Sequence, residues 1–349
     1  METTETQSVR TAVKRALLLL NCAMLALGCC GGPLIMRLYF LHGGKRIWLS
    51  SWLETGGWPI ILPPLAVAYM QRRRAADGSS ARFFLMKPSL FFASAIIGIL
   101  TGLDDWLYAY GVARLPVSTS SLILATHLSF TAGFAFLLVK QRFTSYSINA
   151  VVLLTIGAVV LGVHANSDRP KNESKKEYYW GFFMTLATAA LYGLVLPLVE
   201  LTYKKAKQAI TYSLVLEIQM VIALSATGFC TVGMLVNHDF QAISREAKGF
   251  ELGEAHYYVV LVCSAIIWQF FFLGAIGVVF CASSLSSGIV IAALLPITEL
   301  LAIIIYKEKF EAEKGVALAL SLWGFASYFY GEMKHFKKAC VQVIEIEMP

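Results

Sequence analysis

Residues 213–236 read "SLVLEIQMVIALSATGFCTVGMLV". The stretch is long and apolar enough to cross the hydrocarbon core of a bilayer, which is about 30 Å thick. It nevertheless contains Glu217 and Gln219. A carboxylate inside a membrane helix is costly, so it is a functional candidate by default. This stretch therefore predicts a transmembrane helix and, within it, part of a buried polar site.

The rest of the chain has the same character. Hydrophobic residues make up 57% of it and charged residues only 15%, which is too little charge for the surface of a soluble protein of this length. The apolar blocks show no period-2 alternation, which argues against membrane strands. We therefore expect an all-α polytopic membrane protein with ten transmembrane helices. The expected spans are roughly residues 16–40, 47–70, 88–112, 116–139, 146–164, 178–202, 211–236, 257–281, 285–305 and 314–331.

The net charge of +7 indicates an orientation in the membrane rather than a nucleic-acid partner. Basic residues sit in short loops such as "QRRR" at 71–74 and "KKAK" at 204–207, as is typical of cytoplasmic loops. The Lys and Arg distribution favours cytoplasmic N- and C-termini. Asn172 is then a possible glycosylation site in an outer loop. The polar N-terminal residues 1–15 do not resemble a cleaved signal peptide. Seven cysteines without a CxxC pair suggest packing roles, so we expect no disulfide, metal site or cofactor.

A repeat relates the two halves of the chain. "ATHLSFTAGFAFLLVKQRF" at 125–143 resembles "AALLPITELLAIIIYKEKF" at 292–310, an offset of 167 residues. The matched pairs are Ser120 with Ser287, Thr131 with Thr298, Lys140 with Lys307, Phe143 with Phe310, and Gly157 with Gly324. Five spans per half is an odd number, so the second half should enter the membrane inverted, as in many alternating-access transporters. The expected organisation is a tail at 1–15, repeats at 16–164 and 178–331, an outer loop at 165–177 and a tail at 332–349.

Longer strings resemble the plant purine permeases of the drug/metabolite transporter superfamily. They are "FLHGGKRIWLSSWLETGGWPI", "GLDDWLYAYGVARLPVSTSSLI", "FTAGFAFLLVKQRFT", "WQFFFLGAIGVVFCASSLSSGI" and "EKGVALALSLWGFASYFYGEMK". The resemblance covers nearly the whole chain. It implies ten helices and proton-coupled uptake of adenine, cytokinins, caffeine and related heterocycles, in our expectation across the plasma membrane. Some relatives carry alkaloids or vitamins. Many members have glutamine where this sequence has His127.

Two glutamates are the first candidates for the site. Glu54 and Glu217 occupy matching places, each about seven residues into its span. Inversion would place one carboxylate towards each face of a central cavity. Burial favours the neutral acid, so either group could exchange a proton or share hydrogen bonds with a heterocycle. The alternative is a permanent polar tie between helices.

Helical spacing indicates which further residues share a helix face in the candidate site. Trp58 lies one turn after Glu54, Trp106 and Tyr110 share a face, and Trp268 precedes Gln269. A flat base needs aromatic faces, and stacking contributes about 1–3 kcal/mol per base in nucleic-acid proteins. The alternative for each aromatic residue is ordinary packing. The run "GGWPIILPP" at 56–64 marks the second span as a kinked, broken or moving element.

Four further residues extend the candidate set. Asp104 and Asp105 point about 100° apart on a helix, so at most one should face the cavity and relay protons; the alternative is capping of a helix broken after Gly102. His127 shares a face with the substrate candidate Thr131. Glu299 follows Pro296 by one turn and is a further proton-coupling candidate.

Three rival functions remain open at this level. "DDWLY" could belong to an intramembrane prenyltransferase, but no second acidic cluster is present to hold Mg²⁺. A sugar-phosphate or nucleotide-sugar exchanger would need buried basic residues, and only Arg37 is a candidate. Nothing favours a non-transporting receptor or scaffold. The expected partners are a small neutral or cationic heterocycle, protons and the bilayer, with no nucleic acid; the sequence does not determine the oligomeric state.

Overall fold

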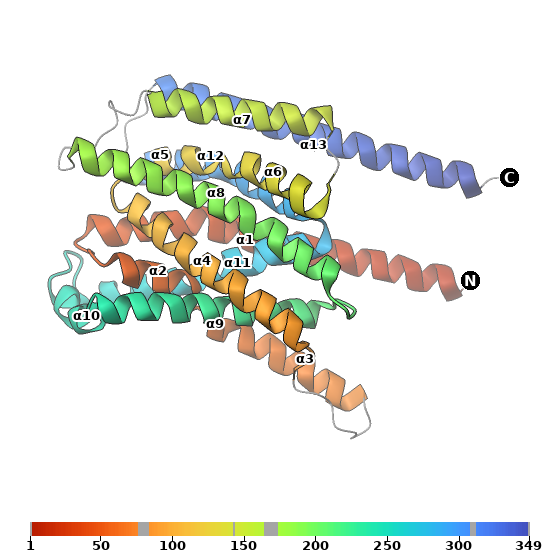
Figure 1. Cartoon of the computed structure of the whole chain (residues 1–349), viewed down its shortest axis with the longest axis horizontal. Coiled ribbons are helices and arrows are strands. Elements are labelled where there is room, and N and C mark those ends of the chain that lie inside the picture. The colour runs from red at the N-terminus through yellow and green to blue at the C-terminus, as the bar shows by residue number, and fades with distance from the viewer. Residues whose placement is uncertain (1, 76–83, 142–143, 164–173, 308–311, 348–349) are drawn as a thin grey trace.

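The computed structural model describes residues 2–75, 84–141, 144–163, 174–307 and 312–347, and within these ranges the chain forms helices joined by short connections. The helices run side by side, and both ends of the chain emerge at the same end of the bundle (Figure 1). The elements are α1 Glu2–Leu41, α2 Ile47–Gly56, the 3₁₀-helix η1 Trp58–Ile61, α3 Leu62–Ala75, α4 Pro88–Val112, α5 Val117–Leu124, α6 His127–Val139, α7 Ser145–Val163, α8 Lys175–Lys205, α9 Tyr212–Val236, α10 Asp239–Lys248, α11 Glu254–Cys281, α12 Ser284–Tyr306 and α13 Ala312–Glu347. Asn172, Phe143, Phe310 and most of the expected loop 165–177 lie outside the described residues.

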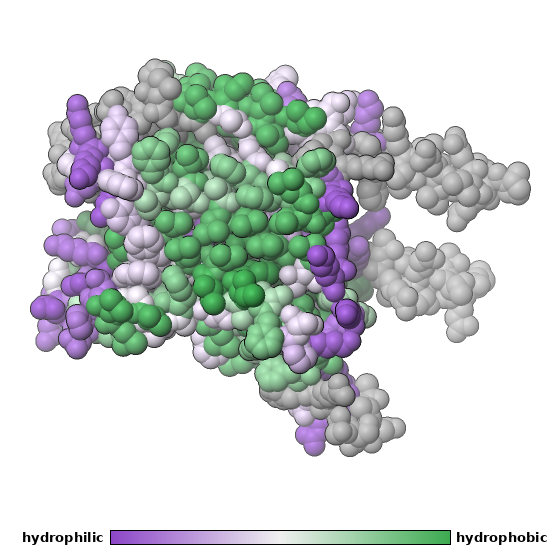
Figure 2. Space-filling view, viewed as in Figure 1, coloured by the Kyte–Doolittle hydropathy of each residue, from purple (hydrophilic) through white to green (hydrophobic). Residues whose placement is uncertain are grey.

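The chain is a polytopic membrane protein. Within the described ranges, seven helices are long and apolar enough to cross a bilayer. Figure 2 shows the corresponding surface, in which a broad apolar band is flanked by hydrophilic side chains at both ends of the bundle. The seven candidate spans are Ala12–Leu41, Pro88–Val112, Thr119–Val139 (which takes α5 and α6 together), Lys175–Lys205, Tyr212–Val236, Glu254–Cys281 and Ser284–Tyr306.

Two of the ten expected spans are interrupted. The helix expected over 47–70 divides into α2, η1 and α3, because Gly56 and Gly57 weaken the helix and Pro59 starts a new turn. The helix expected over 116–139 divides between α5 and α6. There the Thr126 hydroxyl and backbone N–H both bond to the Ile123 carbonyl, which tightens the last turn of α5. His127 is therefore the first residue of a new helix.

One helix was not expected. The sequence analysis predicts no helix between the spans at 211–236 and 257–281, but residues Asp239–Lys248 form the short helix α10. It lies across the end of the bundle opposite the two termini (Figure 1). Asp239, Ala242 and Ala247 are buried whereas Phe240 and Arg245 are exposed, so one face of α10 packs onto the bundle.

Helices α1 and α11 pack at backbone distance. A Cβ placed on Gly274 would overlap the backbone of Leu25, and one placed on Gly28 would overlap the backbone of Phe271. Small residues allow such close approach in membranes, where dispersion contacts replace the hydrophobic effect as the driving force. This contact fixes α11 against α1 directly beside the cavity described below.

A second close contact is reciprocal. A methyl group on Gly157 of α7 would lie 3.4 Å from the Ala317 carbonyl of α13, and one on Gly324 of α13 would lie 3.3 Å from the Ala150 carbonyl of α7. Positions 150 and 317, like 157 and 324, differ by the 167 residues of the sequence repeat. Two helices related by a two-fold axis would make this pair of contacts.

The α1–α11 contact generates a test. We expect Gly274→Ala to lower the melting temperature of the protein in detergent, because the added methyl group has to displace the backbone of Leu25. Gly228→Ala on α9 is the matched control, since nothing lies within 4 Å of its Cβ position among the described residues and alanine is the better helix former. Equal melting temperatures for the two variants would contradict the close packing of α1 on α11.

Candidate functional site

A cavity lies inside the bundle, between helices from both halves of the chain. Its open volume is about 60 Å³, which is smaller than a typical small-molecule site. Side chains from α1, α2, α4, α5, α6, α8, α11 and α12 face it. The lining residues are Cys29, Pro33, Glu54, Asp104, Asp105, Tyr108, Leu124, His127, Thr188, Tyr192, Trp268, Phe271, Phe272, Ile291 and Leu295.

Three carboxyl groups share this cavity. Glu54, Asp104 and Asp105 are all at least 95% buried, with 2%, 5% and 1% of their surfaces exposed. Each has a buried carboxyl oxygen without a hydrogen-bond partner in the described part of the chain. Our expectation that at most one aspartate faces the cavity is wrong, because both Asp104 and Asp105 of α4 line it. Three acids this close to one another and to hydrocarbon cannot all be ionised unless a cation compensates their charge. Without such a cation, at least one of them has to be protonated.

Two side-chain nitrogen atoms in the cavity can form hydrogen bonds. The His127 Nδ1 lies 2.9 Å from the Leu124 carbonyl, and since a carbonyl only accepts, Nδ1 carries the proton. The neutral ring then presents Nε2 as an acceptor. Neither this Nε2 nor the indole N–H of Trp268 has a hydrogen-bond partner among the residues described. The Trp268 N–H is thus a free donor in the cavity, while the His127 ring also interacts with the backbone of Gly288.

Aromatic rings form the walls. Tyr108 meets Trp268 edge to face at 5.3 Å between centroids, and Tyr192 lies 5.6 Å from Phe271. Sequence reasoning missed Tyr108, Tyr192, Thr188 and Phe271. One signal was available, because Tyr108 follows Asp104, and Tyr192 follows Thr188, by one helical turn.

The cavity does not include every residue singled out in the sequence. Trp106 stacks on Trp48 with centroids 5.4 Å apart, and Tyr110 lies under the Arg114 guanidinium at 3.6 Å. Trp58 packs with the apolar cluster around Ile61. The three remaining candidates are buried but are not among the lining residues: Thr131 beside Gly193, Gln269 beside Gly57, and Glu299 within α12.

Glu217 has a different environment from Glu54. Its Oε2 accepts hydrogen bonds from the backbone N–H groups of Leu85 at 2.9 Å and Met86 at 3.1 Å, and its Oε1 lies 3.6 Å from Arg72 Nη1. The expected pair of carboxylates around one cavity is therefore not formed. Although Glu54 and Glu217 hold matching places in the repeat, the segment before α4 folds onto Glu217 and ties it to α3.

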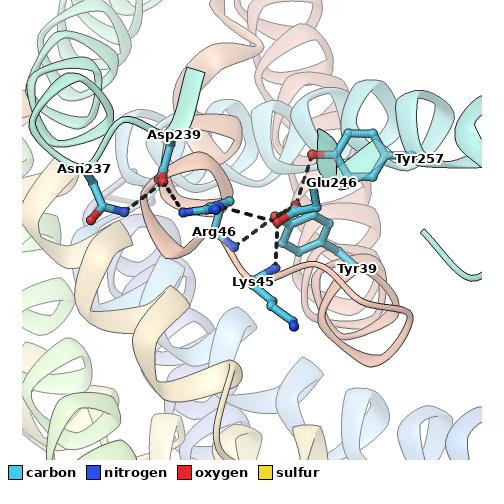
Figure 3. Close-up of polar contacts among 7 residues, drawn as sticks. All are labelled: Tyr39, Lys45, Arg46, Asn237, Asp239, Glu246 and Tyr257. Atoms are coloured by element: carbon cyan, nitrogen blue, oxygen red, sulfur yellow. Dashed lines mark hydrogen bonds and ion pairs between the residues drawn. The ribbon is translucent and has the colours of Figure 1, made fainter. Parts of the chain in front are cut away.

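A second ion-pair cluster closes the opposite end of the bundle (Figure 3). Arg46, which precedes α2, lies 3.3 Å from Asp239 and 3.6 Å from Glu246 of α10. Asp239 is fully buried and also accepts from the Asn237 amide at 2.8 Å. The buried charge thus has both a cation and a hydrogen-bond donor, as buried charges require.

Glu246 anchors the same cluster to the long helices. Its Oε1 accepts from the hydroxyls of Tyr39 on α1 and Tyr257 on α11, at 2.5 and 3.1 Å, and its Oε2 accepts from the Lys45 backbone N–H at 3.2 Å. The connection between α1 and α2 is therefore held against α10 and the start of α11. The cluster formed by Arg46, Asp239 and Glu246 is called the α10 cluster below.

Comparisons with known proteins decide the family. A family model described as "Purine nucleobase transmembrane transport" matches residues 16–338. Purine permease 3 of Arabidopsis thaliana is 59% identical over 321 residues, which cover 92% of this chain and 92% of that protein. The chain belongs to the plant purine permease family. Purine permease 2 of the same plant is 55% identical over 342 residues, covering 95% and 96% of the two chains.

The purine permeases are transporters and not enzymes. A solved crystal structure shares the fold, with a TM-score of 0.56 at 14% identity over 89% of this chain and 95% of the other. Among the described residues, no group of three or more His, Cys, Asp or Glu is arranged to hold a metal ion.

The contrast between the two glutamates generates a test of the site geometry. Glu217→Leu should lower the free energy of unfolding by about 1–3 kcal/mol, because it leaves two backbone donors and Arg72 without their acceptor. Glu54→Leu should leave the stability of the ligand-free protein unchanged or raise it, because it removes a buried acid without a full set of partners. Melting temperatures in neutral detergent measure both. If Glu54→Leu were the more destabilised variant, the assignment of Glu217 as the structural tie would fail.

Proposed function

We propose that this chain transports purine bases and purine derivatives together with protons, by alternating access. The observation that carries the proposal is the cavity itself, in which Glu54, Asp104 and Asp105 face aromatic walls. Flat heterocycles fit aromatic walls, and ring nitrogens and exocyclic amines pair with carboxyl groups, an indole N–H and an imidazole nitrogen. The relatives named above support the same class of substrate.

Protons are the coupling ion that this cavity suits best. A buried carboxyl group is most stable when neutral, and three of them together make at least one protonation strongly favourable. We assign the proton to the trio of Glu54, Asp104 and Asp105. Glu217 and Glu299 become secondary candidates, because neither lines the cavity. His127 Nε2 and the Trp268 N–H are assigned to the substrate.

The residues that line the cavity also indicate that the substrate is not an anion. No Lys or Arg is among the described residues around the cavity, and an anionic substrate would leave its charge unpaired there. Neutral or weakly basic heterocycles remain. Adenine, cytokinins and caffeine-like compounds are the substrates we propose, and alkaloids or vitamins of similar shape are the alternative.

We further propose ten spans in two inverted halves. Three observations support this arrangement. Gly157 and Gly324 make the reciprocal contact described above. Lys140 and Lys307, which match in the repeat, both end their helices in the left-handed conformation, with φ of 54° and 52°. Both termini lie at one end of the bundle (Figure 1), as an even number of spans requires. The basic loops favour a cytoplasmic position for that end. We place the protein in the plasma membrane.

Alternating access requires that each end of the cavity can close. Two ion pairs occupy opposite ends of α2–α3 and α9. Arg46 meets Asp239 at one end, and Arg72 meets Glu217 at the other. We assign the α10 cluster to the outer closure and the Arg72–Glu217 pair to the inner closure. With both pairs formed, the substrate would be enclosed.

Proton coupling predicts a loss of concentrative uptake. Glu54→Gln and Asp105→Asn should reduce accumulation of labelled adenine in transporter-deficient yeast by about tenfold or more, equivalent to about 1.4 kcal/mol of coupling. The neutral amides keep size and hydrogen bonding but cannot exchange a proton. In the unmodified protein, uptake should fall as external pH rises, and in the variants it should be low and nearly independent of pH.

Glu254→Gln is the matched control for that experiment, because it removes an exposed carboxylate at the start of α11. Surface expression is measured in parallel. Accumulation that survives a protonophore but stops without sodium would refute proton coupling. Unchanged pH dependence in both acid variants would refute the assignment of the proton to Glu54 and Asp105.

The two closures predict opposite changes in access to the cavity. Cys29 lines the cavity and is 3% exposed, so it reports entry of a membrane-impermeant thiol reagent, with peptide mass spectrometry locating the label. Arg46→Gln should raise labelling from the side opposite the termini, and Arg72→Gln should raise it from the side of the termini.

Arg46→Lys should keep labelling near the unmodified level, because it keeps a cation between Asp239 and Glu246. Lys45→Gln is the control, since only the backbone N–H of Lys45 bonds to Glu246. Labelling that rises from the same side in Arg46→Gln and Arg72→Gln would contradict the assignment of one closure to each end.

A further inference from the structure

A second cavity opens on the outside of the bundle, between the start of α4 and the end of α8. Its open volume is about 300 Å³. Leu90 and Ala93 of α4 and Leu201 of α8 form its apolar wall. Lys87, Lys205 and Lys207 form its rim, and all three are exposed. These residues are called the lysine groove below.

The charge of the lysine groove is not neutralised by the protein. Among the described residues, no carboxylate forms an ion pair with Lys87, Lys205 or Lys207; the neighbouring Glu200 pairs instead with Lys204 at 2.8 Å. Lys87 Nζ donates to the carbonyl of Lys207, which adds a hydrogen bond but no negative charge. Three cations therefore surround one space without a counter-charge from the described chain.

The position of the groove relates it to the bilayer. Phe91 and Phe92, on the same turn of α4, expose 47% and 66% of their surfaces, as side chains in contact with lipid do. Hydrophilic side chains gather at the same end of the bundle, at the border of the apolar band (Figure 2). The lysines thus stand at the level of lipid headgroups, while the apolar wall below them faces acyl chains.

We propose that the lysine groove binds an anionic phospholipid. Its phosphate and acidic headgroup would pair with Lys87, Lys205 and Lys207, and one acyl chain would lie along Leu90, Ala93 and Leu201. Basic pockets between membrane helices bind anionic headgroups in this way, and each Lys or Arg near the membrane surface strengthens the binding of anionic lipid. A zwitterionic lipid lacks the net charge that the groove would compensate.

The groove is connected to the inner closure. The Gln208 amide donates to the Leu85 carbonyl at 3.3 Å, and Leu85 and Met86 are held by Glu217. A lipid that joins Lys87 to Lys205 and Lys207 would therefore stabilise the contact between the segment before α4 and the segment after α8. Binding and thermal stability report this effect without any reference to transport.

The test titrates the purified full-length protein, in neutral detergent, with short-chain phosphatidylserine and separately with short-chain phosphatidylcholine. Native mass spectrometry counts bound lipid and a thermal melt measures stability. Phosphatidylserine should bind and raise the melting temperature, whereas phosphatidylcholine should do so weakly. Removing each lysine should raise the half-saturating lipid concentration on the order of fivefold, so the triple variant K87Q/K205Q/K207Q should lose nearly all specific binding.

The matched control is K14Q/R73Q/R74Q, which removes three exposed basic residues elsewhere on the described chain. If the triple lysine variant is poorly folded, Lys205→Gln alone replaces it, because its side chain is exposed and forms no ion pair with a described residue. Unchanged phosphatidylserine binding in the groove variants overturns the proposal, as does an equal loss in the control. Equal stabilisation by inorganic phosphate would reduce the groove to a simple anion site and would also overturn it.

Discussion

Three carboxyl groups in the middle of an apolar bundle set the conditions for the rest of this structure. Moving an isolated carboxylate from water into a medium of low dielectric constant costs far more than a folded protein can supply. Glu54, Asp104 and Asp105 are nevertheless almost fully buried. They have to be shielded from lipid on every side, and the close contact of α1 with α11 contributes part of that shield. They also have to be neutral, hydrated or matched to a ligand.

Two other buried acids have basic partners. Glu217 has two backbone donors and Arg72, and Asp239 has Arg46 and the Asn237 amide. Both belong to contacts that tie one end of the bundle together. Among the described residues, each of these two acids at the ends forms an ion pair with an arginine, whereas none of the three acids in the cavity forms an ion pair. In the function proposed above, the acids without an ion pair are the ones available to a proton and a substrate.

The sequence contained enough to predict the class of fold and several site residues. Hydropathy locates the long apolar helices, because a bilayer-spanning helix has to be apolar over most of its length. Glu54, Asp104 and Asp105 stood out because carboxylates are rare in such segments. The positions of Tyr108 and Tyr192 were harder to find, since 13% of the chain is aromatic and most of those rings only pack.

Glu217 shows where sequence reasoning has a physical limit. Its depth in the helix and its place in the repeat equal those of Glu54, yet its partners come from Leu85, Met86 and Arg72, which lie more than a hundred residues away. Helical periodicity describes which face a side chain occupies but not what folds against that face. The break at Thr126 has the same character, because it depends on a local hydrogen bond to Ile123 and determines that His127 begins a new helix.

The cavity divides its chemistry between the two halves of the chain. All three carboxyl groups come from residues 16–164, whereas Tyr192, Trp268 and Phe271 come from residues 178–331. In the function proposed above, the first half holds the proton and the second half supplies most of the stacking surface. A bound base that contacts both halves would link them most tightly when the acids are protonated, because an ionised acid next to hydrocarbon favours an open, hydrated cavity. Movement of one half against the other would then depend on proton and substrate together, which is the physical requirement for coupled transport.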